Sequence, residues 1–319
     1  MRTDYKTKQE VGRTCARWSP WLATVLLCTV GCISVITGDN DTIDRFAEFE
    51  RTGGMLSPSP TEDLDLSDAT QFRWLVWQQE LSELRAESGF VYYEQLKNDA
   101  ELSVLLDHAV AQLAGLNPNR LASRQDRLAF WLNAYNLLTL HAASKAWRIN
   151  PEFRVDDNDF SFFQQEVHRV GEGIYSLNQI ENGILRGDRL HPSTFYLTDD
   201  AFASIQALHD DIWEGNPVDP RIHFVLNCAS SSCPVLTESP LSGLGIEDAM
   251  ESATRAFLSD ADKGAGSEGI SQIFDFYASD FENAGGIEAF IGKYRDLEAV
   301  DTGRFLPYDW SLNLEATED

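Results

Sequence analysis

One short segment, RIHFVLNCASSSCP at residues 221–234, brings a histidine and two cysteines close together in the sequence. A deprotonated Cys228 or Cys233 is a nucleophile suited to acyl transfer, provided that a histidine accepts its proton. The apolar and β-branched run HFVLN predicts a strand, on which His223 and Cys228 would stand about 16 Å apart. The two residues would then not form a local catalytic pair. In that case, we expect the base to be one of the other histidines at positions 141, 168 and 191.

The same two cysteines have a simpler use as a disulfide. The four residues between them include three serines and can curl back, bringing the two Cα atoms within about 4.4 to 6.8 Å. Together with His223 they offer only three soft ligands, whereas structural zinc takes four, so we expect no metal. The strings GxxxxGK[ST], HExxH and GxSxG are absent, and we expect no cofactor. The residues leave thiol chemistry and a pinned loop as alternatives.

The element that would position this segment is a buried helix. The run RLAFWLNAYNLLTLHAASKAW, from about residue 124 to 147, is apolar on nearly every side, which indicates a helix surrounded by other parts of the protein. Asn133 and Asn136 are three residues apart and share one side of it. Buried amides need hydrogen-bond partners, so these two either satisfy the backbone of a neighbouring loop or line a pocket.

Three motifs in this order resemble the domain-of-unknown-function 547 family. They are FWLNAYNLLTL at 130–140, NQIENGILR at 178–186 and DPRIHFVLNCASSSCPVL at 219–236, and FDFYASDF and YDWSLN resemble the C-terminal part of the family. The resemblance covers about residues 70 to 315. It implies a shared fold and brings no assigned reaction. It maps the motif positions of the family onto the following residues: Asn133, Tyr135, Asn136, Glu181, Arg186, His223, Asn227, Cys228, Cys233, Pro234, Tyr308, Asp309, Trp310 and Asn313.

The order of elements predicts an α+β fold. Several helices come first, and short strands follow, including a hairpin in HRVGEGIYSL, so we expect N-terminal helices packed with a small mixed or antiparallel sheet. An acidic linker rich in Ser and Pro occupies 37–66. We expect a single domain over 67–319.

The N-terminal 36 residues predict export. Five basic residues precede the apolar run from Trp21 to Ile36, as in a signal peptide or a membrane anchor. The stretch TVGC resembles a lipobox and would make Cys32 a lipidation site. We therefore expect a bacterial periplasmic or membrane-anchored protein, with any membrane contact made through this segment alone.

The net charge of −26 disfavours nucleic acid as a partner, because an acidic surface repels phosphates. An unknown small molecule or an envelope protein is the expected partner. The leading interpretation is a binding module in which a Cys228–Cys233 disulfide pins a loop beside a polar pocket. The alternative is a thiol-dependent acyl hydrolase or transferase that uses Cys228 or Cys233, with His223 among its catalytic residues. The candidate pocket residues are Asn133, Tyr135, Asn136, Glu181, Arg186, Asn227, Ser231, Asp309 and Asn313.

Overall fold

The computed structural model describes residues 83–316. The expected export segment with Cys32, the linker and the first residues of the expected domain lie outside this range. The α-helices are α3 (Tyr93–Asn98), α4 (Ala100–Leu113), α5 (Arg124–Ile149), α6 (Asp157–Gln164), α7 (Pro192–Phe195), α8 (Asp199–Trp213), α9 (Ile246–Ser259), α10 (Ile273–Phe276), α11 (Ala278–Phe281) and α12 (Ile287–Ile291). Short 3-10 helices form η2 (Pro118–Arg120), η4 (Pro220–Phe224), η5 (Gly243–Gly245), η6 (Glu282–Ala284) and η7 (Leu297–Ala299). The element η3 (Gln179–Leu185) is a π-helix.

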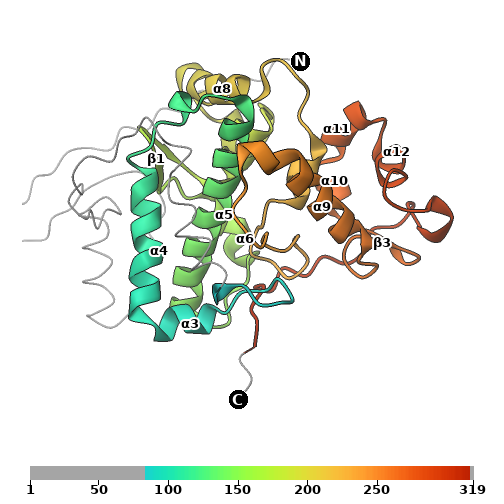
Figure 1. Ribbon diagram of the computed structural model, residues 1–319, viewed down its shortest axis with the longest axis horizontal. Coiled ribbons are helices and arrows are strands. Elements are labelled where there is room, and N and C mark those ends of the chain that lie inside the picture. The colour runs from blue at the N-terminus through green and yellow to red at the C-terminus, as the bar shows by residue number, and fades with distance from the viewer. Residues whose placement is uncertain (1–82, 317–319) are drawn as a thin grey trace, which may run out of the picture. The chain divides into compact units, whose positions relative to one another are not determined.

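Helix α5 is the central element of this part of the chain, as Figure 1 shows. The hydroxyl of Ser123 accepts a hydrogen bond from the backbone N–H of Asp126 and so caps the start of the helix. Every residue from Leu128 to Leu140 is buried, which confirms the prediction of a helix without a polar face. Helices α4 and α8 and the turn η3 pack against it. Because other elements enclose α5, side chains on several of its sides are held in fixed positions relative to those elements.

The strands are short and lie in two antiparallel hairpins. The first pairs β1 (His168–Val170) with β2 (Gly173–Tyr175), where the sequence predicted a hairpin, and the second pairs β3 (Ala265–Gly266) with β4 (Gly269–Ile270). The described residues are therefore mostly helical with two small sheets, which is compatible with an α+β fold. The string GAGSEG at 264–269 has the spacing GxGxxG, but it forms the turn of the second hairpin. It does not lead from a strand into a helix, as a dinucleotide-binding loop would.

The strand predicted at HFVLN is wrong. Residues 220–224 form the turn η4, because the Asp219 side chain accepts from the backbone N–H of Arg221 and Pro220 favours the start of a helical turn. The segment GISQIFDF contributes only two residues to β4 before it enters α10. Near the C-terminus, Ser311 and Leu312 make single bridges to Arg154 and Ser230 instead of a continuous strand.

The core has two parts. The larger surrounds α5, and the smaller consists mainly of aromatic side chains beneath α9 to α12. Phe224 of η4 lies in the smaller part, where its ring stacks on Phe290 at a centroid distance of 5.8 Å. Its neighbour Val225 belongs to the larger part, so the chain passes from one core to the other just before the cysteines. No helix between residues 83 and 316 has both the length and the apolar character needed to cross a membrane.

Candidate functional site

A cavity of about 820 Å³, called here the central cavity, lies at the cysteine segment. Side chains from α5, α6, α10, η3 and η4 and from the C-terminal segment line it. Six of the candidate catalytic and pocket residues meet there, namely Tyr135, Glu181, Arg186, His223, Cys228 and Cys233. The arrangement brings together groups that are up to 98 positions apart in the sequence.

The cysteine loop, residues 227–234, is attached to α5 through two amide side chains. Asn136 donates to Val225 O and accepts from Asn227 N, both at 2.8 Å. Asn227 in turn donates to Pro234 O at 2.7 Å and accepts from Ala229 N, so that it ties the two ends of the loop together. These contacts satisfy the buried amides of Asn136 and Asn227. They also fix the position of Cys228, which follows Asn227 in the chain and lines the cavity.

The C-terminal segment fixes the other side of the loop. The N–H of Ser231 donates to Ser311 O, and the N–H of Asn313 donates to Ala229 O. The loop also contains a strained residue, because Ala229 is fully buried with φ of 64°. A residue with a Cβ pays roughly 1 to 2 kcal/mol for this left-handed conformation. Such strain persists only where the surroundings determine the backbone, and it is frequent at functional sites.

Cys228 and Cys233 are both free thiols, so the structure does not contain the predicted disulfide. Cys228 is a half-buried residue, and its sulfur lies 3.0 Å from Ser230 Oγ and 3.6 Å from the hydroxyl of Tyr308. Cys233 is buried, and its sulfur accepts from the N–H of Cys228 at 2.8 Å. The two thiols therefore have different surroundings.

The pKa values of the two thiols move in opposite directions. Burial on its own would raise the pKa of Cys228, but hydrogen bonds with Cys233, Ser230 and Tyr308 outweigh it and leave the pKa below the ordinary value. Burial raises the pKa of the Cys233 thiol well above the ordinary value, and the neighbouring Cys228 adds to the increase. Cys228 is thus the thiol that ionises first, which is the property of a nucleophile.

Glu181 lies in the cavity wall between two tyrosines. The hydroxyl of Tyr135 donates to one carboxylate oxygen at 2.7 Å, and the hydroxyl of Tyr277 donates to the other. Burial, and then the charge of Glu181, raises the pKa of both tyrosines well above the ordinary value, so both hydroxyls keep their protons. The carboxylate is held by side chains from α5 and from the end of α10.

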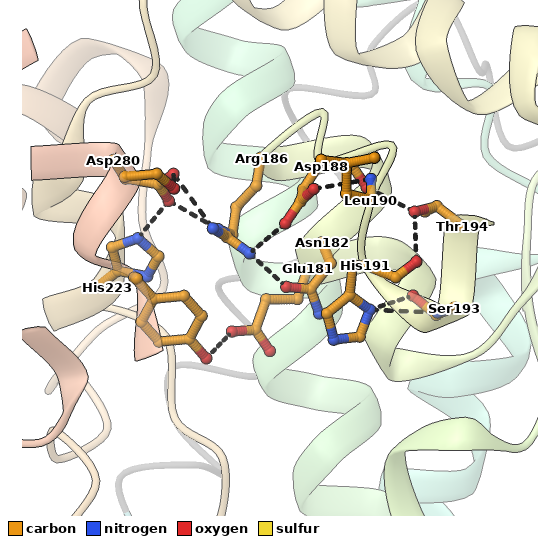
Figure 2. Close-up of polar contacts among 12 residues, drawn as sticks. Glu181, Asn182, Arg186, Asp188, Leu190, His191, Ser193, Thr194, His223 and Asp280 are labelled. Carbon is orange, nitrogen blue, oxygen red and sulfur yellow. Dashed lines mark hydrogen bonds and ion pairs between the residues drawn. The ribbon is translucent and has the colours of Figure 1, made fainter. Parts of the chain in front are cut away.

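A second charged cluster joins η3 and η4 to α11 (Figure 2). The guanidinium of Arg186 binds both carboxylate oxygens of Asp280, at 2.6 and 3.2 Å, and His223 Nε2 lies 2.8 Å from Asp280 Oδ2. Burial alone would raise the pKa of Asp280, but its bonds with His223 and Arg186 lower it below the ordinary range. Burial lowers the pKa of His223, whose ring is neutral and stacks on Tyr277 at 4.0 Å. Its Nδ1 is buried and has no hydrogen-bond partner among the described residues.

The other histidines that the sequence offered as bases divide between two locations. His191 lines the central cavity and bonds with Ser193 Oγ at 2.8 Å (Figure 2), and burial lowers its pKa. His141 binds Asp107 outside the cavity wall, and His168 is buried in β1. Among the described residues, the side-chain partners of the Cys228 sulfur are Ser230 and Tyr308, and no histidine contacts it.

The remaining candidate pocket residues do not line the central cavity. Asn133 binds the backbone of Leu241 through both ends of its amide, and together with Asn136 it borders a separate crevice of about 30 Å³. Ser231 bonds with Ser311, and Asp309 accepts from the N–H of the same residue. Asn313 accepts from the buried hydroxyl of Tyr93. The common role of these polar side chains is to fix the backbone around the site.

The family model of DUF547, a protein of unknown function, matches residues 118–258. Residues 118–258 of the chain therefore match the DUF547 family, as the sequence motifs predicted. No curated protein and no solved structure matches it. The matched range contains α5, η3 and both cysteines, whereas the motifs FDFYASDF and YDWSLN lie beyond its end.

Three residues that contact the candidate site lie outside the matched range. Tyr277, Asp280 and Tyr308 contact Glu181, His223 and Cys228 respectively. Sequence reasoning did not select the first two at all, and it noted Tyr308 only as part of a family motif. The signal in the sequence is that Tyr277 and Asp280 stand in FDFYASDF and Tyr308 in YDWSLN, which resemble the C-terminal part of the family. Spacing could not reveal their contacts, because these span 57 to 96 positions.

Most backbone donors of the cysteine loop already have partners within the protein. The backbone N–H groups of residues 228, 229, 231, 232 and 233 are all engaged within the protein, so the loop does not offer them to an oxyanion. No cluster of three or more His, Cys, Asp or Glu side chains that could hold a metal occurs within residues 83–316. The donor nearest to the Cys228 sulfur that faces the cavity is the hydroxyl of Tyr308.

Proposed function

We propose that this DUF547 domain is a thiol-dependent acyl hydrolase or transferase, with Cys228 as its nucleophile. The observation that carries the proposal is the difference between the two cysteines that line the cavity: Cys228 is a half-buried residue whose thiol pKa is lowered, whereas Cys233 is buried and its thiol pKa is raised. In a disulfide-pinned binding loop, different pKa values of the two thiols would serve no purpose. A nucleophilic cysteine acts as the thiolate, so a lowered pKa at one of the two thiols favours catalysis.

In the proposed reaction, the thiol of Cys228 loses its proton to water in the open cavity. The thiolate forms an S–C bond to the substrate carbonyl, and the carbonyl oxygen becomes an oxyanion. Tyr308, whose hydroxyl is 3.6 Å from the sulfur, donates a hydrogen bond to that oxygen. The bond between carbon and the leaving group breaks, and the leaving group takes a proton from water. Water or a second nucleophile then cleaves the thioester and restores the thiol.

His223 has a positioning role in this proposal. Its Nε2 and the guanidinium of Arg186 share Asp280, and its ring supports that of Tyr277, which holds Glu181. Arg186, His223, Tyr277 and Glu181 therefore form one connected part of the cavity wall. This role differs from the catalytic one suggested by the sequence, because the histidine does not contact the thiol.

The test uses p-nitrophenyl acetate with the full-length protein. We expect a burst of p-nitrophenolate and an acetyl adduct, found by mass spectrometry on the tryptic peptide 222–255, at Cys228. Cys228→Ala abolishes the burst and the adduct. The matched variant Cys233→Ala keeps the adduct at Cys228. Acetylation of Cys233 in the wild type, or none of either thiol, would overturn the proposal.

A binding module without covalent chemistry is the second candidate. The observation in its favour is that no described histidine contacts the Cys228 sulfur, whereas thiol hydrolases usually pair the two. In this case, the central cavity would bind a small molecule or part of an envelope protein, and the polar residues of its wall would orient it. The absence of an acetyl adduct on Cys228 is the outcome that favours this candidate.

We also propose that the protein is exported. It would be either free in the bacterial periplasm or attached to the membrane by its N-terminal segment. Support comes from the basic residues that precede the apolar run 21–36, and TVGC at 29–32 supports lipidation of Cys32. Mass spectrometry of the protein isolated from its cells tests this: a lipidated N-terminal Cys32 is expected for a lipoprotein, and an unprocessed chain recovered with the cytosol would contradict export.

A further inference from the structure

Four aromatic side chains form a continuous wall on one side of the central cavity. Trp310 is in contact with the other three, at ring-centroid distances of 4.3 Å to Tyr308, 4.8 Å to Phe160 and 5.9 Å to Phe276. All four line the cavity. Phe160 and Phe276 are 36% and 41% exposed, although they could pack into the core if burial were their only function. The aromatic wall therefore begins beside the Cys228 thiol, at Tyr308, and extends to the solvent.

The placement of Phe160 in this wall costs conformational energy. Asn158, Asp159 and Phe160 all have positive φ, of 51°, 55° and 59°. For a bulky residue such as Phe160, this conformation is a genuine outlier. The turn directs an apolar ring to the edge of a polar cavity and sets the carboxylate of Asp159 next to it in the cavity wall. Strain kept at a cavity edge indicates that the position of these side chains matters for function.

The charged groups of the cavity are mostly acidic. Four carboxyl side chains line it, those of Asp159, Glu166, Glu181 and Asp188. Among the described residues that line it, Arg186 is the one arginine, and its guanidinium is committed to Asp280 and Asp188. No lysine occurs among these residues. A cavity of this composition repels anionic substrates and attracts cations.

We infer that the central cavity selects an acyl substrate that carries an ammonium group, primary or quaternary, and that this group binds against the aromatic wall. The inference rests on the proposed function, since it names the substrate class of the same site. Aromatic faces attract cations through their quadrupole, and Trp is the most effective of them. Asp159, beside Phe160, supplies the opposite charge. The carbonyl carbon of such a substrate reaches Cys228 because Tyr308 belongs to both the wall and the surroundings of the thiol.

Methanethiosulfonate reagents test the inference without an assigned substrate. The thiolate attacks the sulfenyl sulfur, a disulfide to the reagent forms, and methanesulfinate leaves. We compare the trimethylammonium-ethyl, methyl and sulfonato-ethyl reagents on the full-length protein, and we follow the adduct at Cys228 on peptide 222–255. Cys228→Ala verifies the site. The expected second-order rate constants fall in the order ammonium, methyl, sulfonate, with at least a tenfold preference for the ammonium reagent over the sulfonate.

Matched variants separate the aromatic wall from the general attraction of an acidic protein. Phe276→Leu should lower the ratio of ammonium to methyl rates at least threefold. Phe305 has a similar exposure of 43% and does not line the cavity, so Phe305→Leu should leave the ratio unchanged. In the same way, Asp159→Asn should lower the ratio, whereas Asp248→Asn, on the exposed start of α9, should not.

The results distinguish this inference from the proposed function. Fast methyl labelling of Cys228 with no charge preference, or an equal preference in Phe276→Leu and wild type, would overturn the ammonium site and leave the nucleophile in place. A Cys228 that reacts no faster than a free thiol with all three reagents would count against the nucleophile itself.

Discussion

Asn136 on α5 and Asn227 in the cysteine loop are joined by a hydrogen bond of 2.8 Å from the N–H of Asn227 to the side-chain oxygen of Asn136. The amide nitrogen of the same side chain binds Val225 O. One residue of the buried helix thus holds the backbone on both sides of Leu226, directly before the thiol. The position of Cys228 depends on this attachment.

Asn136→Ala should therefore affect both stability and the thiol. The loss of a buried amide that satisfies two backbone groups costs about 1 to 3 kcal/mol in the free energy of unfolding, measured with urea. The labelling rate of Cys228 should change as well, because its loop is released. Asn133→Ala is the matched control, since Asn133 makes the same pair of contacts with Leu241 instead. We expect Asn133→Ala to lower the stability by a similar amount and to leave the labelling rate of Cys228 unchanged. An equal change of the labelling rate in both variants would contradict the specific role of Asn136.

Tyr308 should help to keep the Cys228 thiol acidic. Its hydroxyl is among the groups that lower the pKa of this thiol. The rate of alkylation by iodoacetamide follows the thiolate fraction, so the midpoint of its pH profile should lie below that of an ordinary cysteine in the wild type. In Tyr308→Phe, the midpoint should move to higher pH. An identical profile in the two proteins would show that the hydroxyl does not stabilise the thiolate.

Asp280 should be more important for stability than its exposed neighbours. It pairs with Arg186, whose side chain is only 4% exposed, and with His223. Removal of one partner of a buried ion pair costs about 3 to 5 kcal/mol, because the other charge stays behind. Asp280→Asn should lower the free energy of unfolding by roughly 3 kcal/mol. Asp275→Asn, an exposed carboxylate on α10, should change it by less than about 0.5 kcal/mol. Equal values for the two variants would contradict a structural role for the cluster.

The stability of the domain should decrease in mild acid. Burial lowers the pKa of His168 to about 3, while the unfolded chain binds the same proton near its ordinary pKa of 6.5. The unfolded state therefore binds more protons between these two pKa values, and the contribution is complete above pH 6.5 and declines as the pH falls below it. For one histidine, the loss between pH 7 and 5 is about 2 kcal/mol. His168→Leu should reduce this pH dependence by that amount in urea unfolding, and His108→Gln, on the exposed face of α4, is the control. A steeper decline in His168→Leu than in wild type would reverse the sign of this prediction.

The sequence predicted the elements whose pattern is local. Helix α5 follows from an unbroken apolar run, and the first hairpin follows from a glycine pair between two short β-prone runs. The strand expected at HFVLN was wrong because residues 219 and 220, just before it, start a helical turn, and because Phe224 and Val225 enter different cores. A helical turn also removes the basis for the 16 Å separation of His223 and Cys228, since both line one cavity.

The site was predictable only in part, for a related reason. The cysteines could be selected from residue type and spacing, whereas Glu181 and Arg186 were selected only because their segment resembles a motif of the family. Tyr277 and Asp280 could not, because an ordinary aromatic or acidic residue gains its significance from a contact with a distant segment. The amides of Asn133 and Asn136 illustrate the opposite case: their burial was predictable, but the choice between pocket and backbone depended on which loops pack beside α5.

The contacts between residues 229–231 and 311–313 also have a consequence for biosynthesis. Ser231 and Ser311 are 80 positions apart, so a ribosome makes the thiol-bearing loop well before the segment that pairs with it. Tyr308, which helps to acidify the thiol, arrives equally late. The nascent chain therefore carries Cys228 without Tyr308, and the hydrogen bonds that lower the pKa of this thiol are complete only after translation has passed residue 308.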